Sequence, residues 1–96
     1  MIAVTAIFRV KPENAAETEE ILNPLIRGSR KDKGNIQYRC FADSGAPGTY
    51  VFHEVWENRE CLDLHMKQPH FTEFGKQIAP LLLEEMKLHM HEREID

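Results

Sequence analysis

The stretch that decides the fold is YVFHEVWENRECLDLHMKQPHF, which runs from Tyr50 to Phe71. Its first seven residues alternate in character, and this alternation predicts a β-strand whose side chains point in turn to two opposite faces. One face of that strand carries Tyr50, Phe52, Glu54 and Trp56. A carboxylate among aromatic rings either reaches solvent or is kept for a partner, because burying an unpaired carboxylate is costly. Glu54 is therefore the first candidate functional residue.

The second half of the stretch predicts a short helix. Asn58 is suited to cap its N-terminus, because an asparagine side chain can accept a hydrogen bond from a free backbone N–H of the first turn. Cys61, Leu62 and His65 then share one side at helical spacing. We therefore expect His65 to face inward.

The rest of the chain supplies further elements in a definite order. Alternating residues predict strands over 2–10, 35–42 and 86–93, and apolar residues at helical spacing predict helices over 13–31 and 71–81. The loop over 43–48 joins two strands directly, which indicates an antiparallel hairpin. Together with the central stretch, the order is strand, helix, strand, strand, helix, strand. This order predicts an α+β, ferredoxin-like split βαβ fold, in which a four-stranded antiparallel sheet carries helices on one face.

The length of 96 residues predicts a single domain over 1–96 that needs a partner for stability. A chain this short buries only roughly 60 to 65% of the surface that it exposes when unfolded. The sheet face away from the helices carries too many apolar side chains to be left in water. We therefore expect a homodimer in which two sheets pair face to face.

The charge balance argues against nucleic acid and anionic membranes as partners. With 12 basic and 16 acidic residues the formal charge is −4, so we expect no binding to nucleic acid or to an anionic membrane. No apolar run approaches the roughly 20 residues that cross a bilayer, and we expect a cytoplasmic protein. Cys40 and Cys61 are not spaced as CxxC, and we expect two reduced thiols.

The central stretch also carries a resemblance to a known family. Its ordered polar and aromatic positions are Glu54, Trp56, His65, Pro69, His70 and Phe71, and the opening AIFRVKPE stands at Ala6–Glu13. This set resembles the signature of the antibiotic biosynthesis monooxygenase-like family. The resemblance extends over nearly the whole chain and implies a dimeric α+β barrel.

The candidate catalytic residues are Glu54, His65 and His70. A carboxylate can orient one tautomer of an imidazole and raise the basicity of its other nitrogen, which would make a general base. The alternative is a strand carboxylate in an ordinary salt bridge, with two histidines as polar residues at helix ends. The resemblance favours the catalytic interpretation, because in the family this region borders the ligand cavity.

Four aromatic residues are the candidate substrate-binding positions: Tyr38, Phe52, Trp56 and Phe71. Tyr38 and Trp56 combine a large ring with one hydrogen-bond donor, which suits a flat aromatic or polyoxygenated ligand and a developing oxyanion. The alternative is that these rings simply fill the core.

We expect no metal site and no cofactor. His89 and His91 share a strand face and His53 could join them, but histidine pairs on such a face are common and no further ligand is placed by the sequence. There is neither a glycine-rich phosphate loop nor a GxSxG nucleophile motif.

The resemblance implies a small enzyme similar to the cofactor-independent quinol or anthrone monooxygenases. There a general base generates a phenolate or carbanion, which is electron-rich enough to react with dioxygen without metal or flavin. The haem-degrading branch fits less well, because the first strand lacks an asparagine and no histidine lies between Phe71 and Leu88. Two alternatives remain: an isomerase of a small phosphorylated ketone, and a non-catalytic dimeric module that binds a small ligand or serves in stress.

Overall fold

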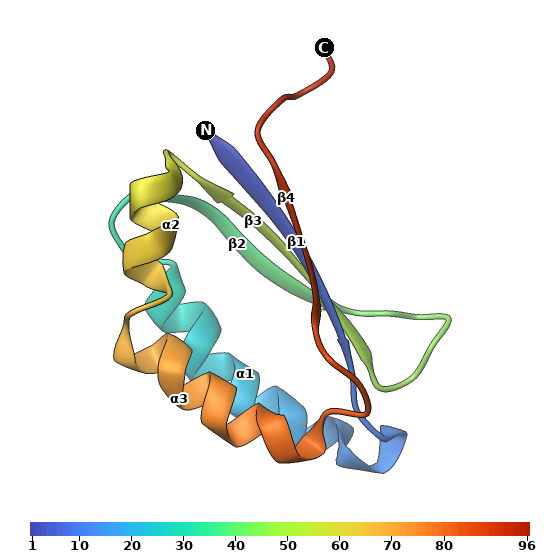
Figure 1. The fold of residues 1–96 in the computed structure, drawn as a ribbon. Coiled ribbons are helices and arrows are strands. Elements are labelled where there is room, and N and C mark those ends of the chain that lie inside the picture. Colours follow the sequence, from blue (N-terminus) through green and yellow to red (C-terminus); the bar gives the residue numbers. More distant parts are fainter.

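The computed structural model describes residues 1–96 and contains a four-stranded antiparallel sheet with helices against one face (Figure 1). The strands are β1 (Ile2–Arg9), β2 (Asn35–Ala42), β3 (Thr49–Trp56) and β4 (Lys87–His91). The helices are α1 (Ala15–Ser29), α2 (Arg59–His65) and α3 (Pro69–Ile78), with short 3-10 turns η1 (Pro12–Asn14) and η2 (Ala79–Leu81). The strand order is β2-β3-β1-β4. The expected ferredoxin-like α+β fold is confirmed.

The inner face of the sheet forms as the alternation predicts. In β1 every second side chain is buried, and β3 presents Phe52, Glu54 and Trp56 to the same layer. β2 and β3 pair antiparallel as a hairpin, which confirms that expectation. Because neighbouring strands are in register, these side chains form one continuous surface against α1 and α3.

Capping and proline chemistry set the ends of α2 and α3. The Asn58 side chain accepts a hydrogen bond of 2.9 Å from the backbone N–H of Cys61, as expected for an N-cap. Helix α3 begins at Pro69, where a missing N–H costs nothing, and ends two residues before Pro80. Only the turn 66–68 separates the two helices, so His65 at the end of α2 lies close to the first turn of α3.

A glycine allows the turn after α1 to pack against α2. Gly34 has a φ of 75°, which a residue with a side chain rarely adopts. A Cβ at this position would also collide with Sγ of Cys61. This close approach brings the turn between α1 and β2, over residues 30–34, next to α2 (Figure 1).

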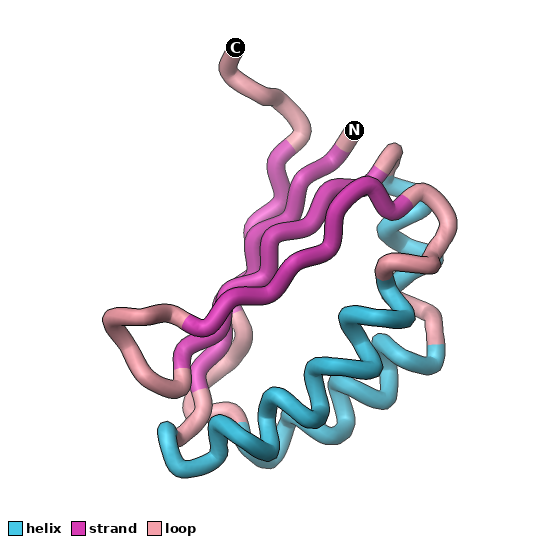
Figure 2. Tube along the Cα trace, turned by 180° about the vertical axis from the view of Figure 1, so that it is seen from behind, coloured by secondary structure: helices cyan, strands magenta, loops and turns pink.

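The opposite face of the sheet is not covered by any helix (Figure 2). Its centre is formed by half-buried apolar or small side chains: Ala3, Thr5, Ile7, Val51 and Val55. His53 and His89 flank Thr5 in the strand register, and His91 stands opposite Ala3 one pair further along. None of the helices combines the length and the apolar composition that crossing a lipid bilayer requires.

Candidate functional site

A cavity of about 230 Å³, which has more apolar lining residues than any other and is called the main cavity here, lies between the inner face of the sheet and α3. Residues from several elements line it, among them Tyr38, Phe52, Glu54, Phe71, Phe74 and Leu88. Glu54 is the one charged side chain in the lining. The cavity is therefore an apolar, aromatic chamber with a carboxyl group in its wall.

A second, small cavity of about 60 Å³ lies on the side of α2. It is lined by His65, Leu62 and Met66 from the α2 region and by Val4 from β1. Glu54, Phe71 and Leu88 line both cavities. Glu54 therefore stands between the main cavity and the small cavity.

The carboxyl group of Glu54 is held in an environment that changes its acidity. The residue is only 7% exposed, and Nε1–H of Trp56 donates a hydrogen bond of 3.0 Å to its Oε1. Burial raises the pKa of Glu54 to about 7, and the bond from Trp56 lowers it in part. Near neutral pH both the protonated and the ionised forms are thus populated, which is the condition for efficient proton transfer.

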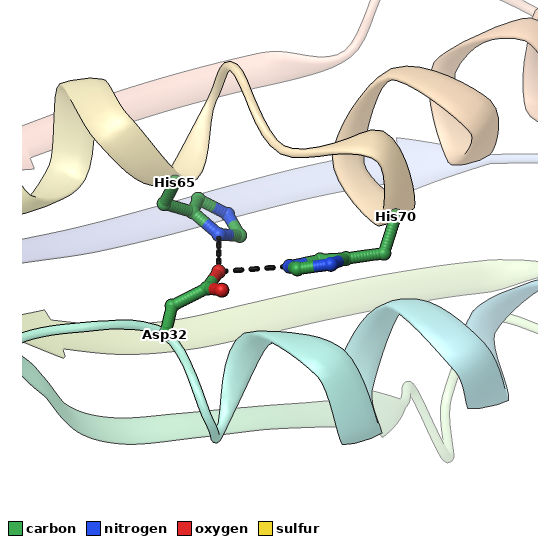
Figure 3. A group of neighbouring side chains, drawn as sticks. All are labelled: Asp32, His65 and His70. Carbon is green, nitrogen blue, oxygen red and sulfur yellow. Dashed lines mark hydrogen bonds and ion pairs between the residues drawn. The ribbon is translucent and has the colours of Figure 1, made fainter.

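Beside the small cavity, Asp32, His65 and His70 form a carboxylate–histidine triad (Figure 3). Oδ2 of Asp32 lies 2.8 Å from Nδ1 of His65 and 2.8 Å from Nε2 of His70. Three segments meet here, namely the turn after α1, the end of α2 and the first turn of α3. Gly28 makes room on α1, since a Cβ there would stand 2.8 Å from the His70 ring.

The environment of His65 disfavours protonation of its ring. The side chain is 1% exposed, and burial lowers the pKa of His65, an effect that Asp32 opposes in part. An ionised carboxylate only accepts hydrogen bonds, so an aspartate at this position favours the neutral tautomer that carries its proton on Nδ1. Nε2 then carries a lone pair, and it has no hydrogen-bond partner among the protein atoms. The ring centroid lies 4.6 Å from that of Trp56 and 5.1 Å from that of Phe71.

The ligand atoms of the triad lie within 4.8 Å of one another, a spacing at which a cation could be considered. Two imidazoles and one carboxylate are ligands that several transition metals accept. Here, however, both ring nitrogens are directed at one carboxylate oxygen at hydrogen-bond distance, so this oxygen occupies the point where the two rings converge (Figure 3). This geometry suits two N–H donors that share one acceptor.

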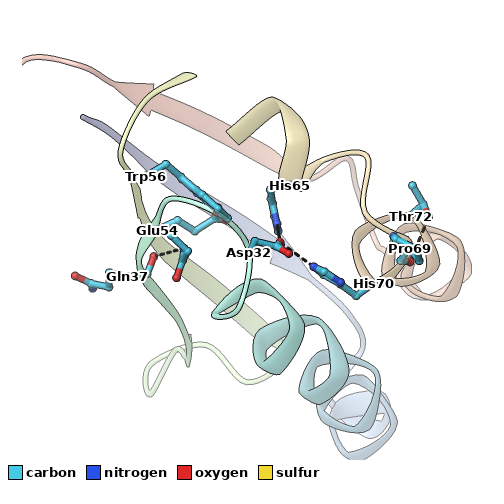
Figure 4. A network of polar contacts seen from close by, with 9 residues as sticks. Asp32, Gln37, Glu54, Trp56, His65, Pro69, His70 and Thr72 are labelled. Carbon is cyan, nitrogen blue, oxygen red and sulfur yellow. Dashed lines mark hydrogen bonds and ion pairs between the residues drawn. The ribbon is translucent and has the colours of Figure 1, made fainter. Parts of the chain in front are cut away.

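The structure pairs the candidate catalytic residues differently from the sequence-based expectation (Figure 4). Glu54 bonds to Trp56, while His65 and His70 both bond to Asp32. The physical reason is proximity: Trp56 follows Glu54 by two residues on the same strand face, and packing of α1 against α3 brings Asp32 to both histidines. Glu54 and His65 still share the small cavity, whereas His70 lines neither cavity.

Three of the four candidate substrate-binding residues, Tyr38, Phe52 and Phe71, line the main cavity. Trp56 is 0% exposed and lines neither cavity, and it contacts the site through its bond to Glu54 and through its ring, which packs against that of His65. Burial raises the pKa of Tyr38 far above its usual range, and the charge of Glu54 adds to this effect. Tyr38 therefore remains a phenol that can donate a hydrogen bond.

Asp32 is the member of the site that sequence reasoning missed. It stands among charged residues in a turn, where an acidic side chain is commonplace, and it is 33 residues from His65 and 38 from His70. The glycine at position 34 was a signal for a tight turn, but no local pattern indicated what that turn would contact.

Comparisons with known proteins agree with this architecture. A family model described as antibiotic biosynthesis monooxygenase matches residues 1–77. "Putative monooxygenase YcnE" of Bacillus subtilis is 30% identical over 95 residues, which cover 96% of this chain and 100% of that protein. An uncharacterized protein of Synechocystis sp. is 31% identical over 90 residues, and the match spans 94% of this chain but only 61% of the longer relative. A crystal structure described as an antibiotic biosynthesis monooxygenase superposes with a TM-score of 0.93 at 26% identity, covering 99% of this chain and 100% of that one.

Proposed function

Because this chain belongs to the antibiotic biosynthesis monooxygenase family, we propose that it is a monooxygenase that inserts oxygen into a small quinol- or anthrone-like substrate without a cofactor. The observation that carries the proposal is the position of Glu54. Its carboxyl group lines an otherwise apolar aromatic cavity and has a pKa of about 7. A base of that strength is matched to removing a weakly acidic phenolic or benzylic proton at neutral pH.

In the proposed reaction, the Glu54 carboxylate takes a proton from the substrate and leaves a phenolate or carbanion. This anion gives an electron to dioxygen, and recombination forms a carbon–oxygen bond to a peroxide. Loss of water from the protonated peroxide gives the carbonyl product. For a benzylic substrate, a methylene group and one dioxygen thus give a carbonyl group and one water, so that the substrate is oxidised and dioxygen is reduced. We propose that Tyr38, which lines the same cavity and stays a phenol because burial raises its pKa, donates a hydrogen bond to the developing negative charge.

The lining of the main cavity supports an aromatic substrate over a phosphorylated one. Aromatic rings from β2, β3 and α3 offer stacking and edge contacts to a flat molecule. A phosphate group would call for an arginine, a lysine or a row of free backbone N–H groups, and no cationic side chain lines the cavity. The volume of about 230 Å³ lies below the roughly 300 to 1,000 Å³ of sites for drug-sized ligands, which favours quinols of one or two rings over larger anthrones.

Residues beyond the range matched by the family model take part in this cavity. Leu82 and Met86 line it from the segment between η2 and β4, and Leu88 lines it from β4, which supports the treatment of 1–96 as one functional unit. We also propose that two copies pair through the uncovered sheet face, because no helix covers its half-buried apolar centre.

A reducing cytoplasm is the proposed compartment, since Cys40 and Cys61 are both free thiols in the fold.

The test uses Gly75, which lines the main cavity from α3 and has no heavy atom within 4 Å of an added Cβ. One-ring and two-ring quinols, a three-ring anthrone and a phosphorylated ketone are screened for oxygen uptake, with product analysis. Gly75→Leu should fill the cavity and abolish uptake, and the matched control Gly75→Ala should retain it because a methyl group projects little into the space. Binding of a quinol without uptake would favour a non-catalytic module. Uptake that is equal in the two variants would refute the cavity as the reaction site.

A further inference from the structure

His65 has an unused nitrogen in a buried place. Its Nδ1 is bonded to Asp32, and its Nε2, on the far edge of the ring, has no protein partner although the side chain is 1% exposed. A buried polar atom without a partner is uncommon and calls for an explanation. The residue also lines the small cavity whose wall includes Glu54.

We propose that Asp32 is a positioning residue that holds His65 as the Nδ1–H tautomer, so that its Nε2 serves as a second proton acceptor beside the small cavity, which Glu54 also lines. The role in turnover rests on the proposed function, whereas the tautomer does not. Asp32 acts through His65 and lines neither cavity, so it has no direct contact with a substrate in the main cavity.

The small cavity has room for a proton relay, and its otherwise apolar wall carries two polar side chains, Glu54 and His65. Its volume of about 60 Å³ exceeds the roughly 10 to 15 Å³ that a single water requires. Glu54 offers a carboxyl group, of which only Oε1 is engaged by Trp56, and His65 offers the lone pair on Nε2. A water in this space can therefore bridge the two groups and carry a proton between them.

The proposed oxygenation gives a reason for two acceptors. When a methylene group becomes a carbonyl group, two protons leave the carbon, and both are returned to oxygen as water. If Glu54 passes the first proton to Nε2, its carboxylate is free to act again, and the proton returns by the same route to the peroxide. The imidazolium formed in between is stabilised by the Asp32 carboxylate, 2.8 Å from Nδ1.

The charged and titratable groups that surround His65 come from four elements. Asp32 reaches it from the turn after α1, His70 from α3, Tyr38 from β2 and Glu54 from β3. Only Asp32 makes a hydrogen bond to the ring. The tautomer is thus controlled by a single contact, and removing that contact is a clean perturbation.

The direct measurement is the nitrogen-15 NMR spectrum of the imidazole rings in the labelled full chain. In the wild type, His65 should be neutral at pH 7 with its proton on Nδ1. Asp32→Asn should shift His65 toward the Nε2–H tautomer, because the amide nitrogen can donate to Nδ1. Asp63→Asn is the matched control, since Asp63 is an exposed aspartate that bonds to Arg59. A wild-type His65 with its proton on Nε2 would overturn the proposal even if the Asp32 variant did not fold.

Turnover then tests the relay separately. With a substrate found by oxygen uptake, Asp32→Asn should lower kcat by about 100-fold or more and leave KM nearly unchanged, because Asp32 does not touch the substrate. Asp32→Glu, which keeps the carboxylate, should recover part of the loss. The expected tautomer together with full turnover in Asp32→Asn would refute the relay and leave the proposed function standing. Absence of turnover with every substrate would refute the proposed function, while the spectra would still decide the tautomer.

Discussion

Replacing Glu54 with glutamine should make the protein more stable at neutral and alkaline pH while removing its activity. Burial moves the pKa of the carboxyl group from 4.5 to about 7 on folding. Protonation is therefore favoured in the folded state, so that the contribution of this group to stability is present in full below pH 4.5 and is lost as the pH rises through 7. At about 1.4 kcal/mol per tenfold change in affinity for the proton, the loss at high pH is roughly 3 kcal/mol.

The change to glutamine removes the ionisation but keeps the acceptor for Nε1–H of Trp56. The difference in the free energy of unfolding between Glu54→Gln and the wild type should then grow by roughly 2 to 3 kcal/mol between about pH 5 and pH 8. Urea unfolding at fixed protein concentration measures this difference, with the single, fully buried tryptophan as the fluorescent reporter. Glu73→Gln, at an exposed position of α3, is the matched control. Equal pH dependence in Glu54→Gln and the wild type would refute the burial argument.

Substitutions at Trp56, Gly28 and Gly75, removal of metal ions and sedimentation test other features of the structure. Trp56→Phe should raise the pKa of Glu54 above 7, because the donor that favours the carboxylate is gone; a carbon-13 NMR titration that gives an unchanged or lower pKa would contradict this. Gly28→Ala should lower Tm, because the new methyl group would stand 2.8 Å from the His70 ring. Gly75→Ala adds a methyl group in open space, so it should raise the free energy of unfolding by about 0.5 to 1 kcal/mol through helix propensity alone. Dialysis against EDTA should leave Tm unchanged if the carboxylate–histidine triad is held by hydrogen bonds, and a fall of several degrees would point to a bound metal. Sedimentation should report about twice 11.2 kDa, and a stable monomer at micromolar concentration would exclude the paired sheets.

The resemblance to the family, carried by Glu54, Trp56 and the histidines that follow, indicates the region of the candidate site from the sequence alone. What it could not supply was the set of partners within that region. The sequence predicts that Glu54 pairs with a histidine, and in the structure Glu54 and His65 do line the same small cavity. The hydrogen bonds themselves go to Trp56 and to Asp32.

The sequence by itself determined the elements and the face on which each side chain stands. The two-residue period of β3 places Glu54 inward between Phe52 and Trp56, and the cap at Asn58 starts the helix that turns His65 inward. These are local consequences of backbone geometry, so they can be predicted from neighbouring residues.

Only the tertiary structure decided which groups meet and how acidic they are. Asp32 reaches His65 and His70 because α1 packs against α3 and the turn at 30–34 fits under α2, contacts between segments far apart in the sequence. The pKa of Glu54 likewise depends on how completely β1, β3 and α3 exclude water from its carboxyl group. Such properties are set by the distance and burial of atoms brought together by folding, and no spacing along the chain encodes them.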